Sequence, residues 1–337
     1  MADRIPIREA IARQTQSLAD GAASLAAALE ALPLGELASG TTIVTGIGAS
    51  LYAAQTGAAY MRACGMRAFA LASTELYDAA FDGADAYIAL SASGRSVEPA
   101  KAMELRPNAL SFGISGVVDS PLSAYVRHMI GTACGADSGP NTTSYNGTLL
   151  ALAMMAEQAA ARFRFDWRHL PELAGRVLDA VPRQVARAAE RFRNRTSLDC
   201  VASSENLGTA GYTALLLREA PRVAAQQWDT LNFLHGPMEP NDAGTGVILF
   251  GDGREVELAS VLAGFGIPSL LITSRSDVAE ADNLVTITIP ATGNSVADAI
   301  LHTLPAQLLT TQMAEDAGLP VCEFRYRQTG TKLDSPI

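Results

Sequence analysis

Two short segments of this sequence place hydroxyl side chains and glycines directly after an apolar run. The run TTIVTG (41–46) is followed by IGAS, which ends at Ser50. The run AYIALS (86–91) is followed by ASGRS, so that Ser91, Ser93 and Ser96 surround Gly94. A stretch of helical composition begins after each loop. Free N–H groups at a helix N-terminus, together with converging hydroxyls, suit an anion such as phosphate.

The simpler interpretation of these serines is that they cap helices. Either Ser50 or Ser96 would be an N-cap by default. Two serine-rich loops at one sheet edge favour a ligand, because ligands of open parallel sheets bind beyond the carboxyl ends of the strands. A GxGxxG motif would need glycine where Leu51 stands, and no GxxxxGK[ST] motif occurs. A single phosphoryl group therefore fits better than a nucleotide.

Short β-branched runs alternate with alanine- and leucine-rich stretches, and this alternation occurs twice. It is typical of an open parallel sheet covered by helices. The predicted strands of the first half are residues 41–46, 67–73, 86–91, 109–115 and 128–134. Those of the second half are residues 198–203, 222–227, 246–251, 269–274 and 284–289. We predict an α/β fold with two similar units, each a flavodoxin-like five-stranded parallel sheet flanked by helices.

The chain divides into four predicted segments. A helical segment occupies residues 1–30, the first unit 31–165, the second unit 175–320 and a polar tail 321–337. The linker is expected within the polar residues 162–173. The tail is too polar to extend the last helix.

Composition excludes several classes of function. The chain has 337 residues, 48% of them hydrophobic, and a net charge of −10, which argues against binding nucleic acid or an anionic membrane. No segment resembles a signal peptide or membrane span, so we expect a cytoplasmic protein. The cysteines have no metal-binding spacing and are expected to be reduced: Cys64, Cys134, Cys200 and Cys322.

The order strand–GxGxS–helix, strand–SxSGxS–helix and duplicated five-stranded unit resembles the tandem-domain form of the sugar isomerase (SIS) family, in particular the isomerase half of glucosamine-6-phosphate synthases. The resemblance covers essentially the whole chain and implies a sugar-phosphate ligand. The implied phosphate-binding residues are Ser50, Ser91, Ser93 and Ser96, with the backbone of Ala92 and Gly94; Gly48 and Thr143 are weaker candidates for substrate binding. Family members often have Gln where Ala92 stands and Glu where Arg95 stands.

The resemblance also implies three catalytic residues. Glu219 matches the base that moves a proton between C1 and C2, His235 of the HGP sequence matches the residue that opens the sugar ring, and Lys332 matches a tail lysine over the site. Without the resemblance, Glu219 could be a solvated residue opposing its helix dipole, His235 a structural residue of a rigid turn, and Lys332 part of a disordered terminus. The remaining histidines are expected to be structural: His128, His169 and His302.

One phosphate site per chain is expected. The corresponding loop of the second half reads GDGREVE, where Asp252 and Glu255 would meet a phosphate. The resemblance is weaker at the positions that contact the sugar in the family. Leu216 stands where the synthases have a second lysine, and Tyr212 stands where they have a second glutamate.

The expected reaction needs no metal and no redox cofactor. Ring opening, removal of a proton from C2 and its return at C1 interconvert an aldose and a ketose. The sequence begins Met1-Ala2 without a glutamine-hydrolysing domain, so we expect deamination of an amino-sugar phosphate such as glucosamine-6-phosphate. A plain aldose–ketose isomerase, a fructosamine-type deglycase and a non-catalytic phosphosugar sensor remain alternatives. The resemblance further implies a homodimer with shared active sites.

Overall fold

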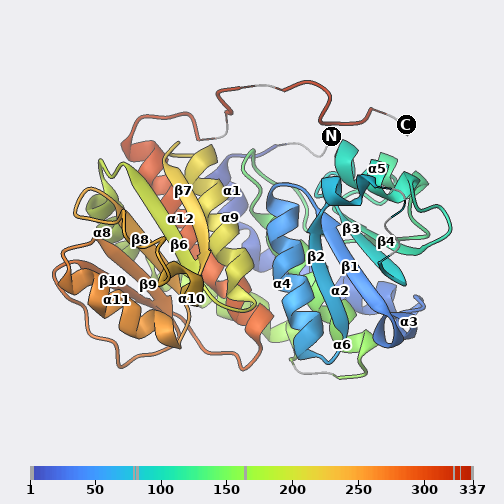
Figure 1. The fold of residues 1–337 in the computed structure, drawn as a ribbon, viewed down its shortest axis with the longest axis horizontal. Coiled ribbons are helices and arrows are strands. Elements are labelled where there is room, and N and C mark those ends of the chain that lie inside the picture. The colour runs from blue at the N-terminus through green and yellow to red at the C-terminus, as the bar shows by residue number, and fades with distance from the viewer. Residues whose placement is uncertain are drawn as a thin grey trace.

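The structure is a computed structural model that describes residues 4–78, 80, 83–162, 165–321, 323–326 and 328–334. It contains two five-stranded parallel sheets with helices between and around them (Figure 1). The predicted fold class is therefore confirmed. Each of the ten predicted strands is present, with ends that differ by no more than a few residues.

The first sheet has the strand order β2-β1-β3-β4-β5. Its strands are β1 (Thr41–Gly46), β2 (Arg67–Ala72), β3 (Ala86–Leu90), β4 (Leu110–Ser115) and β5 (His128–Gly131). The helices of this half are α1 (Ile7–Ala12), α2 (Gln14–Glu30), α3 (Gly35–Ser39), α4 (Ala49–Ala63), α5 (Val97–Glu104) and α6 (Thr143–Ala159). Short 3₁₀ turns follow β2 and β4, at η1 (Ser73–Tyr77) and η2 (Pro121–Ala124).

The second sheet repeats this arrangement with the order β10-β9-β8-β6-β7. Its strands are β6 (Ser197–Ala202), β7 (Ala224–Asp229), β8 (Gly246–Phe250), β9 (Ser269–Thr273) and β10 (Leu284–Thr288). Its helices are α7 (Leu170–Ala180), α8 (Pro182–Phe192), α9 (Asn206–Glu219), α10 (Thr230–Phe233), α11 (Arg254–Gly264) and α12 (Ser295–Asp316), preceded by η3 (Trp167–His169). The predicted linker 162–173 thus includes the start of α7.

The largest hydrophobic core lies between the two sheets. Neighbouring side chains on a strand point to opposite faces, so Val44 of β1 joins this central core while Ile43 packs outward with residues of α5. The second sheet likewise packs outward against α11. Helices from both halves, including α4, α6, α9 and α12, fill the space between the sheets.

Helices α4 and α9 pack against each other at the centre of the molecule (Figure 1). A Cβ atom on Gly208 would lie 2.2 Å from Thr56 Oγ1, and one on Gly211 would lie 2.2 Å from the Tyr52 ring. These two glycines therefore permit the close approach. From Gly208 to Gly211 along α9, the contacts on α4 move back from Thr56 to Tyr52, so the two helices are antiparallel.

The carboxyl ends of the two sheets consequently face opposite ends of the molecule. Figure 1 shows α5, which follows β3, at one end and α10, which follows β7, toward the other. The tail after α12 leaves the second half, crosses the top of the molecule and ends near α5. It thereby connects the second half to the strand edge of the first.

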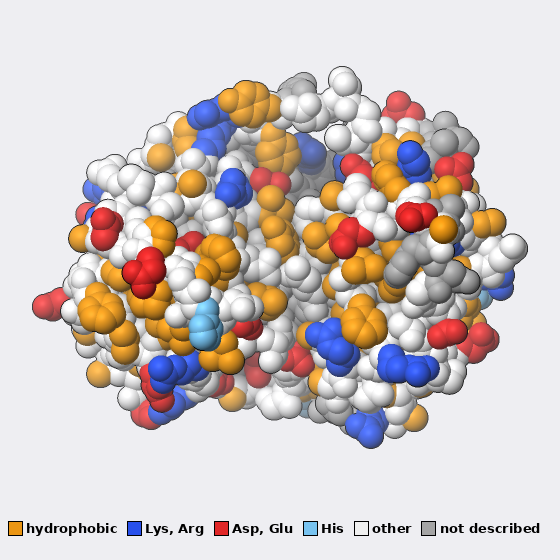
Figure 2. All heavy atoms as spheres, in the orientation of Figure 1, with side chains coloured by type: hydrophobic (Ala, Val, Ile, Leu, Met, Phe, Trp, Pro, Cys, Tyr) orange, Lys and Arg blue, Asp and Glu red, His pale blue; other side chains and the backbone are white. Residues whose placement is uncertain are grey.

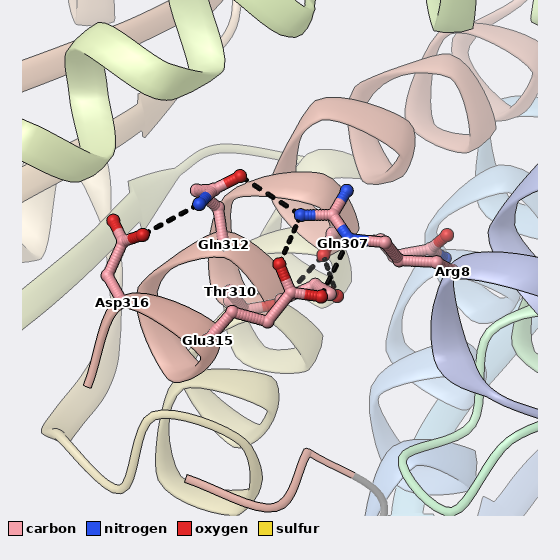
Figure 3. Close-up of polar contacts among 7 residues, drawn as sticks. Arg8, Gln307, Thr310, Gln312, Glu315 and Asp316 are labelled. Carbon is pink, nitrogen blue, oxygen red and sulfur yellow. Dashed lines mark hydrogen bonds and ion pairs between the residues drawn. The ribbon is translucent and has the colours of Figure 1, made fainter. Parts of the chain in front are cut away.

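Polar contacts tie the beginning of the described chain to its last helix. Arg8 of α1 bonds both Gln312, at 3.0 Å from Nη2, and the carboxylate of Glu315 (Figure 3). Gln312 also donates to Asp316 at 2.7 Å. Deeper in the molecule, the buried Glu157 of α6 accepts hydrogen bonds from Tyr60, Trp167 and Asn294, the last of which precedes α12. These contacts make the two halves one packed body.

Within the described residues, no helix is long and apolar enough to cross a membrane. Cys64, Cys134 and Cys200 are buried, whereas Cys322 lies outside the described residues.

Candidate active site

The loop between β3 and α5 forms a compact turn built on Ser91. The Oγ atom of Ser91 lies 3.2 Å from Ser96 Oγ and accepts a hydrogen bond from the Ser96 N–H at 3.3 Å. Both serines are buried, while Ser93 is half-buried at the surface of the loop. Two hydroxyls are thereby held together at the N-terminus of α5, where the helix dipole favours negative charge.

Gly94 is required by the path of this loop. Its φ is +63°, and a Cβ atom there would lie 1.8 Å from Ser120 Oγ. The carbonyl groups of Ala92 and Gly94 accept hydrogen bonds from Gly116 N–H and Leu122 N–H, both at 3.0 Å. Among the residues that the structure describes, the N–H groups of Ser93 and Arg95 donate to none, so these donors remain free for an anion.

The loop after β1 lies next to this turn, because β1 and β3 are neighbours in the sheet. A Cβ atom on Gly46 would lie 2.7 Å from Ser50 Cβ, so glycine at this position lets the start of α4 approach the strand end. Gly48 has a φ of +58° and is the N-cap of α4; it is exposed, and Ser50 is half-buried. The structure therefore brings the two predicted serine loops together at one edge. Their binding of phosphate stays a prediction.

The C-terminal tail pairs with the loop before α5. Ser96 and Lys332 form an antiparallel bridge, and the Leu333 N–H donates to the Arg95 carbonyl at 2.7 Å. Lys332 Nζ donates to Ser96 Oγ at 2.9 Å. Asp334 in turn forms an ion pair with Arg95. Lys332 and Ser96, two of the predicted site residues, are thus in contact although more than two hundred residues separate them in the sequence.

Desolvation lowers the pKa of Lys332. The side chain is partly exposed, yet desolvation by the surrounding protein lowers the pKa of its ammonium; Glu98 opposes this shift, and Arg4 and Arg95 add to it. An anion beside Ser96 would therefore lie next to the Lys332 ammonium, which bonds Ser96 directly, in a protein that is acidic overall.

Glu219 is the last residue of α9 and lies at the same end of the molecule as α5. The contacts of α9 with α4 move from Gly208 opposite Thr56 to Gly211 opposite Tyr52. Continued for two more turns, α9 ends beyond the N-terminus of α4, where Gly48 and Ser50 are found. The antiparallel packing therefore directs this carboxylate toward the edge that carries the serine loops.

The environment of Glu219 keeps its carboxyl group protonated to unusually high pH. Burial at the end of α9 raises its pKa from 4.5 to about 7. No side-chain hydrogen bond or ion pair to Glu219 is found among the described residues to offset this effect. Burial without a counter-charge is the environment that gives a carboxylate the pKa of a general base near neutral pH.

Thr143, the first residue of α6, is buried and its donors are occupied. Its hydroxyl donates to the Ala136 carbonyl at 3.2 Å and its N–H to Asp137 at 3.2 Å. Asp137 also accepts from Thr142 and Ser144, and so caps α6 with a carboxylate of the chain itself. The sequence prediction included Thr143 but missed Asp137, because the loop that returns this carboxylate to the helix has no recognisable local motif.

His235 lies away from the serine loops of its own chain. It follows α10, at the carboxyl edge of the second sheet, and is exposed. Because the edges of the two sheets face opposite ends of the molecule, one chain does not bring His235 to Ser96. Leu231 of α10 is also exposed, at 61%.

The surface between the halves is hollowed beneath the tail. Figure 2 shows the tail arching over a depression that has basic, acidic and apolar side chains on its walls. Among the described residues, no group of three or more His, Cys, Asp or Glu side chains could hold a metal ion. A separate cavity of about 460 Å³ lies elsewhere, between α1, α7, α8 and α12, and its wall includes Arg8 and Asp179.

Comparison with known proteins gives relatives in both sequence and structure, although no family model matches. A glutamine–fructose-6-phosphate aminotransferase (isomerizing) from Pyrobaculum aerophilum is 27% identical over 327 residues, which cover 91% of this chain and 54% of that protein. The chain spans about half the length of the curated relatives that it matches.

Solved structures share the fold over nearly the whole chain. The C-terminal domain of a glucosamine–fructose-6-phosphate aminotransferase from Francisella tularensis has a TM-score of 0.82 at 16% identity, and covers 94% of this chain and 97% of that one. A glucosamine-6-phosphate deaminase from Thermotoga maritima has a TM-score of 0.74 at 19% identity, covering 94% and 98%. At these identities the likeness shows the fold alone.

The raised pKa of Glu219 predicts how stability depends on pH. Between pH 4.5 and 7 the carboxyl ionises more readily in the unfolded chain than in the native one, so it destabilises the native protein progressively as pH rises. Glu219→Gln removes this effect. We expect the variant to gain at most about 3 kcal/mol over the wild type above pH 7 and little below pH 4.5, because a shift from 4.5 to about 7 corresponds to about 1.4 kcal/mol for each pKa unit.

Urea unfolding across this pH range measures the difference. Glu30→Gln, which changes an exposed glutamate at the end of α2, is the matched control and should show no such trend. A pH-independent difference for Glu219→Gln would contradict the raised pKa.

Proposed function

We propose that this chain, a tandem sugar isomerase (SIS) protein by fold and by its relatedness to the isomerase half of aminotransferases, converts an amino-sugar phosphate such as glucosamine-6-phosphate to a ketose phosphate and ammonia. The broader assignment, that the chain is a phosphosugar isomerase of this family, is supported by both its fold and its sequence relatives. The finer assignment rests on the site of this chain. The observation that carries it is the convergence of the two serine loops, Lys332 and the end of α9 on one strand edge.

The first domain binds the phosphate of the substrate in this proposal. Ser50, Ser91, Ser93 and Ser96 supply hydroxyls, and the free N–H groups of the loop before α5 supply further donors. Lys332 adds a positive charge at Ser96. Binding energy from the phosphate, which does not react, then orients the sugar over Glu219.

Glu219 moves the proton in this mechanism. With a pKa of about 7, roughly half of its carboxyl groups are ionised at neutral pH, so the group can remove the C2 proton and return it at C1. A single carboxylate on one face of the planar intermediate is enough for both transfers. For a 2-amino sugar, the resulting imine at C2 is hydrolysed by water to the ketone and ammonia.

Ring opening needs a second acid or base, which we assign to His235 of a partner subunit. The position of His235 supports this, because it is exposed on the sheet edge that faces away from its own serine loops. The neighbouring exposed Leu231 offers an apolar contact for such a partner. The functional unit is then a homodimer with shared sites.

Two other functions remain as alternatives to the deaminase. A plain aldose–ketose isomerase or a fructosamine-type deglycase would use the same phosphate loops and Glu219. A phosphosugar sensor would need the loops only. The half-buried carboxylate of Glu219, which has no hydrogen-bond or ion-pair partner among the described residues, favours an enzyme over the sensor.

The direct test follows ammonia and ketose phosphate after addition of glucosamine-6-phosphate. We expect both products in equal amounts, and no turnover of unphosphorylated glucosamine. Ser96→Ala should raise KM by at least tenfold while lowering stability by only about 1 kcal/mol, because the hydrogen bonds of its hydroxyl with Ser91 and Lys332 are lost.

Ser260→Ala is the control for this variant, since the hydroxyl of Ser260 bonds only within α11. Ketose formation from an aldose phosphate without ammonia would favour the isomerase, and turnover of a sugar–amine conjugate the deglycase. Tight binding with no turnover of any phosphosugar would overturn catalysis, and an unchanged KM in Ser96→Ala would overturn the phosphate site.

Shared active sites predict that two inactive variants complement each other. Glu219→Gln and His235→Ala proteins, mixed and allowed to exchange subunits, form heterodimers in which one site has both wild-type residues. Up to about a quarter of wild-type activity should return, because half of the dimers are mixed and each restores one of two sites. Demonstrated exchange with no recovered activity would show that the site is not shared.

A further inference from the structure

Corresponding loops of the two domains differ at one informative position. The loop after β3 contains GRSVE (94–98), and the loop after β8 contains GREVE (253–257). Strands β3 and β8 occupy the same place in their sheets, each beside the strand that begins its domain. Glu255 therefore stands in the second domain where Ser96 stands in the first.

The carboxylate of Glu255 turns back into its own loop. One oxygen, Oε1, accepts hydrogen bonds from Ser203 Oγ at 2.6 Å and from the hydroxyl of Thr230. The other, Oε2, lies against Gly251, where an added Cβ atom would be only 2.8 Å away. These partners follow β6, β7 and β8, so the carboxylate lies where three strand ends converge.

This buried carboxylate has no basic partner among the described residues. Glu255 is 2% exposed, and the adjacent Arg254 pairs with Glu257 instead. A buried charge is costly unless hydroxyls, N–H groups or a positive charge compensate it. Here the donors are the hydroxyls of Ser203 and Thr230, and Glu255 itself lies in the first turn of α11, so the surroundings resemble those that the first domain offers to an external anion.

A second buried polar side chain at this edge has one ring nitrogen without a hydrogen-bond partner among the described residues. His302 of α12 is 2% exposed, and its Nδ1 lies 2.8 Å from Asn206 Oδ1 at the start of α9. Its ring lies beside Phe250, the residue before Gly251. Its Nε2 is buried and has no hydrogen-bond partner in the described part of the chain. Buried polar atoms without a partner are uncommon in proteins, so this nitrogen adds unused hydrogen-bonding capacity to this region of the second domain.

We propose that the second domain retains a degenerate phosphate site that Glu255 closes from within. Its carboxylate replaces the phosphoryl group that the first domain takes from solution. The chain thus has two cradles, each a set of hydroxyl groups around the loop after the third strand of a domain. The first is open to solution, and the second is filled by the carboxylate of Glu255. The other carboxylate of this loop, Asp252, is bonded to Thr273 and Ser274, so removing the Glu255 carboxylate while leaving the cradle should open the second site to inorganic phosphate.

The test uses the full chain with its first site closed by the reciprocal change. Ser96→Glu places a carboxylate in the first loop, and Glu255→Ser is then added to it. Inorganic phosphate should raise the unfolding temperature of the double variant saturably by several degrees, whereas chloride at equal ionic strength should not. Glu255→Gln in the same background is the matched control, because an amide of the same size still fills the cradle.

Equal responses to phosphate in the Ser and Gln double variants would overturn the inference. Should Glu255→Ser fail to fold in chloride, recovery in phosphate supports the inference and equal failure in both salts contradicts it. A separate comparison tests phosphate binding at the first site. Phosphate should stabilise the wild type more than Ser96→Glu, and failure of that comparison would count against the proposed function but not against the closed second site.

Discussion

The antiparallel contact between α4 and α9 is the constraint on which the candidate site depends. Gly208 and Gly211 have no side chains to hold the helices apart, so Tyr52 and Thr56 pack directly on α9. If the helices were parallel, Glu219 would end at the opposite edge from Ser50. A packing detail in the core thus determines which strand edge receives the carboxylate.

The same contact turns a duplicated fold into an asymmetric molecule. Each domain has a loop that leads into a helix after its third strand, but the two loops face opposite ends. The first is open and is approached by α9 and by Lys332 of the tail. In the second, Glu255 lies in the loop, and His235 stands exposed near the same edge. The division proposed here follows: one edge binds substrate, and the other presents a side chain to a partner.

Local patterns in the sequence predicted most of the fold. Strands were recognised from β-branched runs, the duplication from their spacing, and the serine loops from glycine and serine after a strand. Each of these signals lies within a few residues.

Contacts between distant residues have no such signal. The bridge from Ser96 to Lys332 and the cap of α6 by Asp137 depend on how the loops fold back onto other parts of the chain. The raised pKa of Glu219 could not be predicted from the sequence either, because the burial that raises it depends on how the two halves pack. Thr143 is a weaker candidate from the sequence; in the structure it is buried and donates to Ala136 and Asp137, and its contact with substrate stays a prediction.

The central claim is that Glu219 moves the proton between C1 and C2, and exchange of the substrate C2 hydrogen with deuterated water measures that step directly. Exchange reports the proton transfer even when ring opening or ammonia release limits turnover. Glu219→Gln preserves the size of the side chain but removes the base. The account predicts that the variant still binds the phosphosugar while exchange slows by about 10²- to 10⁴-fold, the usual effect of losing a general base. Exchange at the wild-type rate in Glu219→Gln would show that another residue is the base.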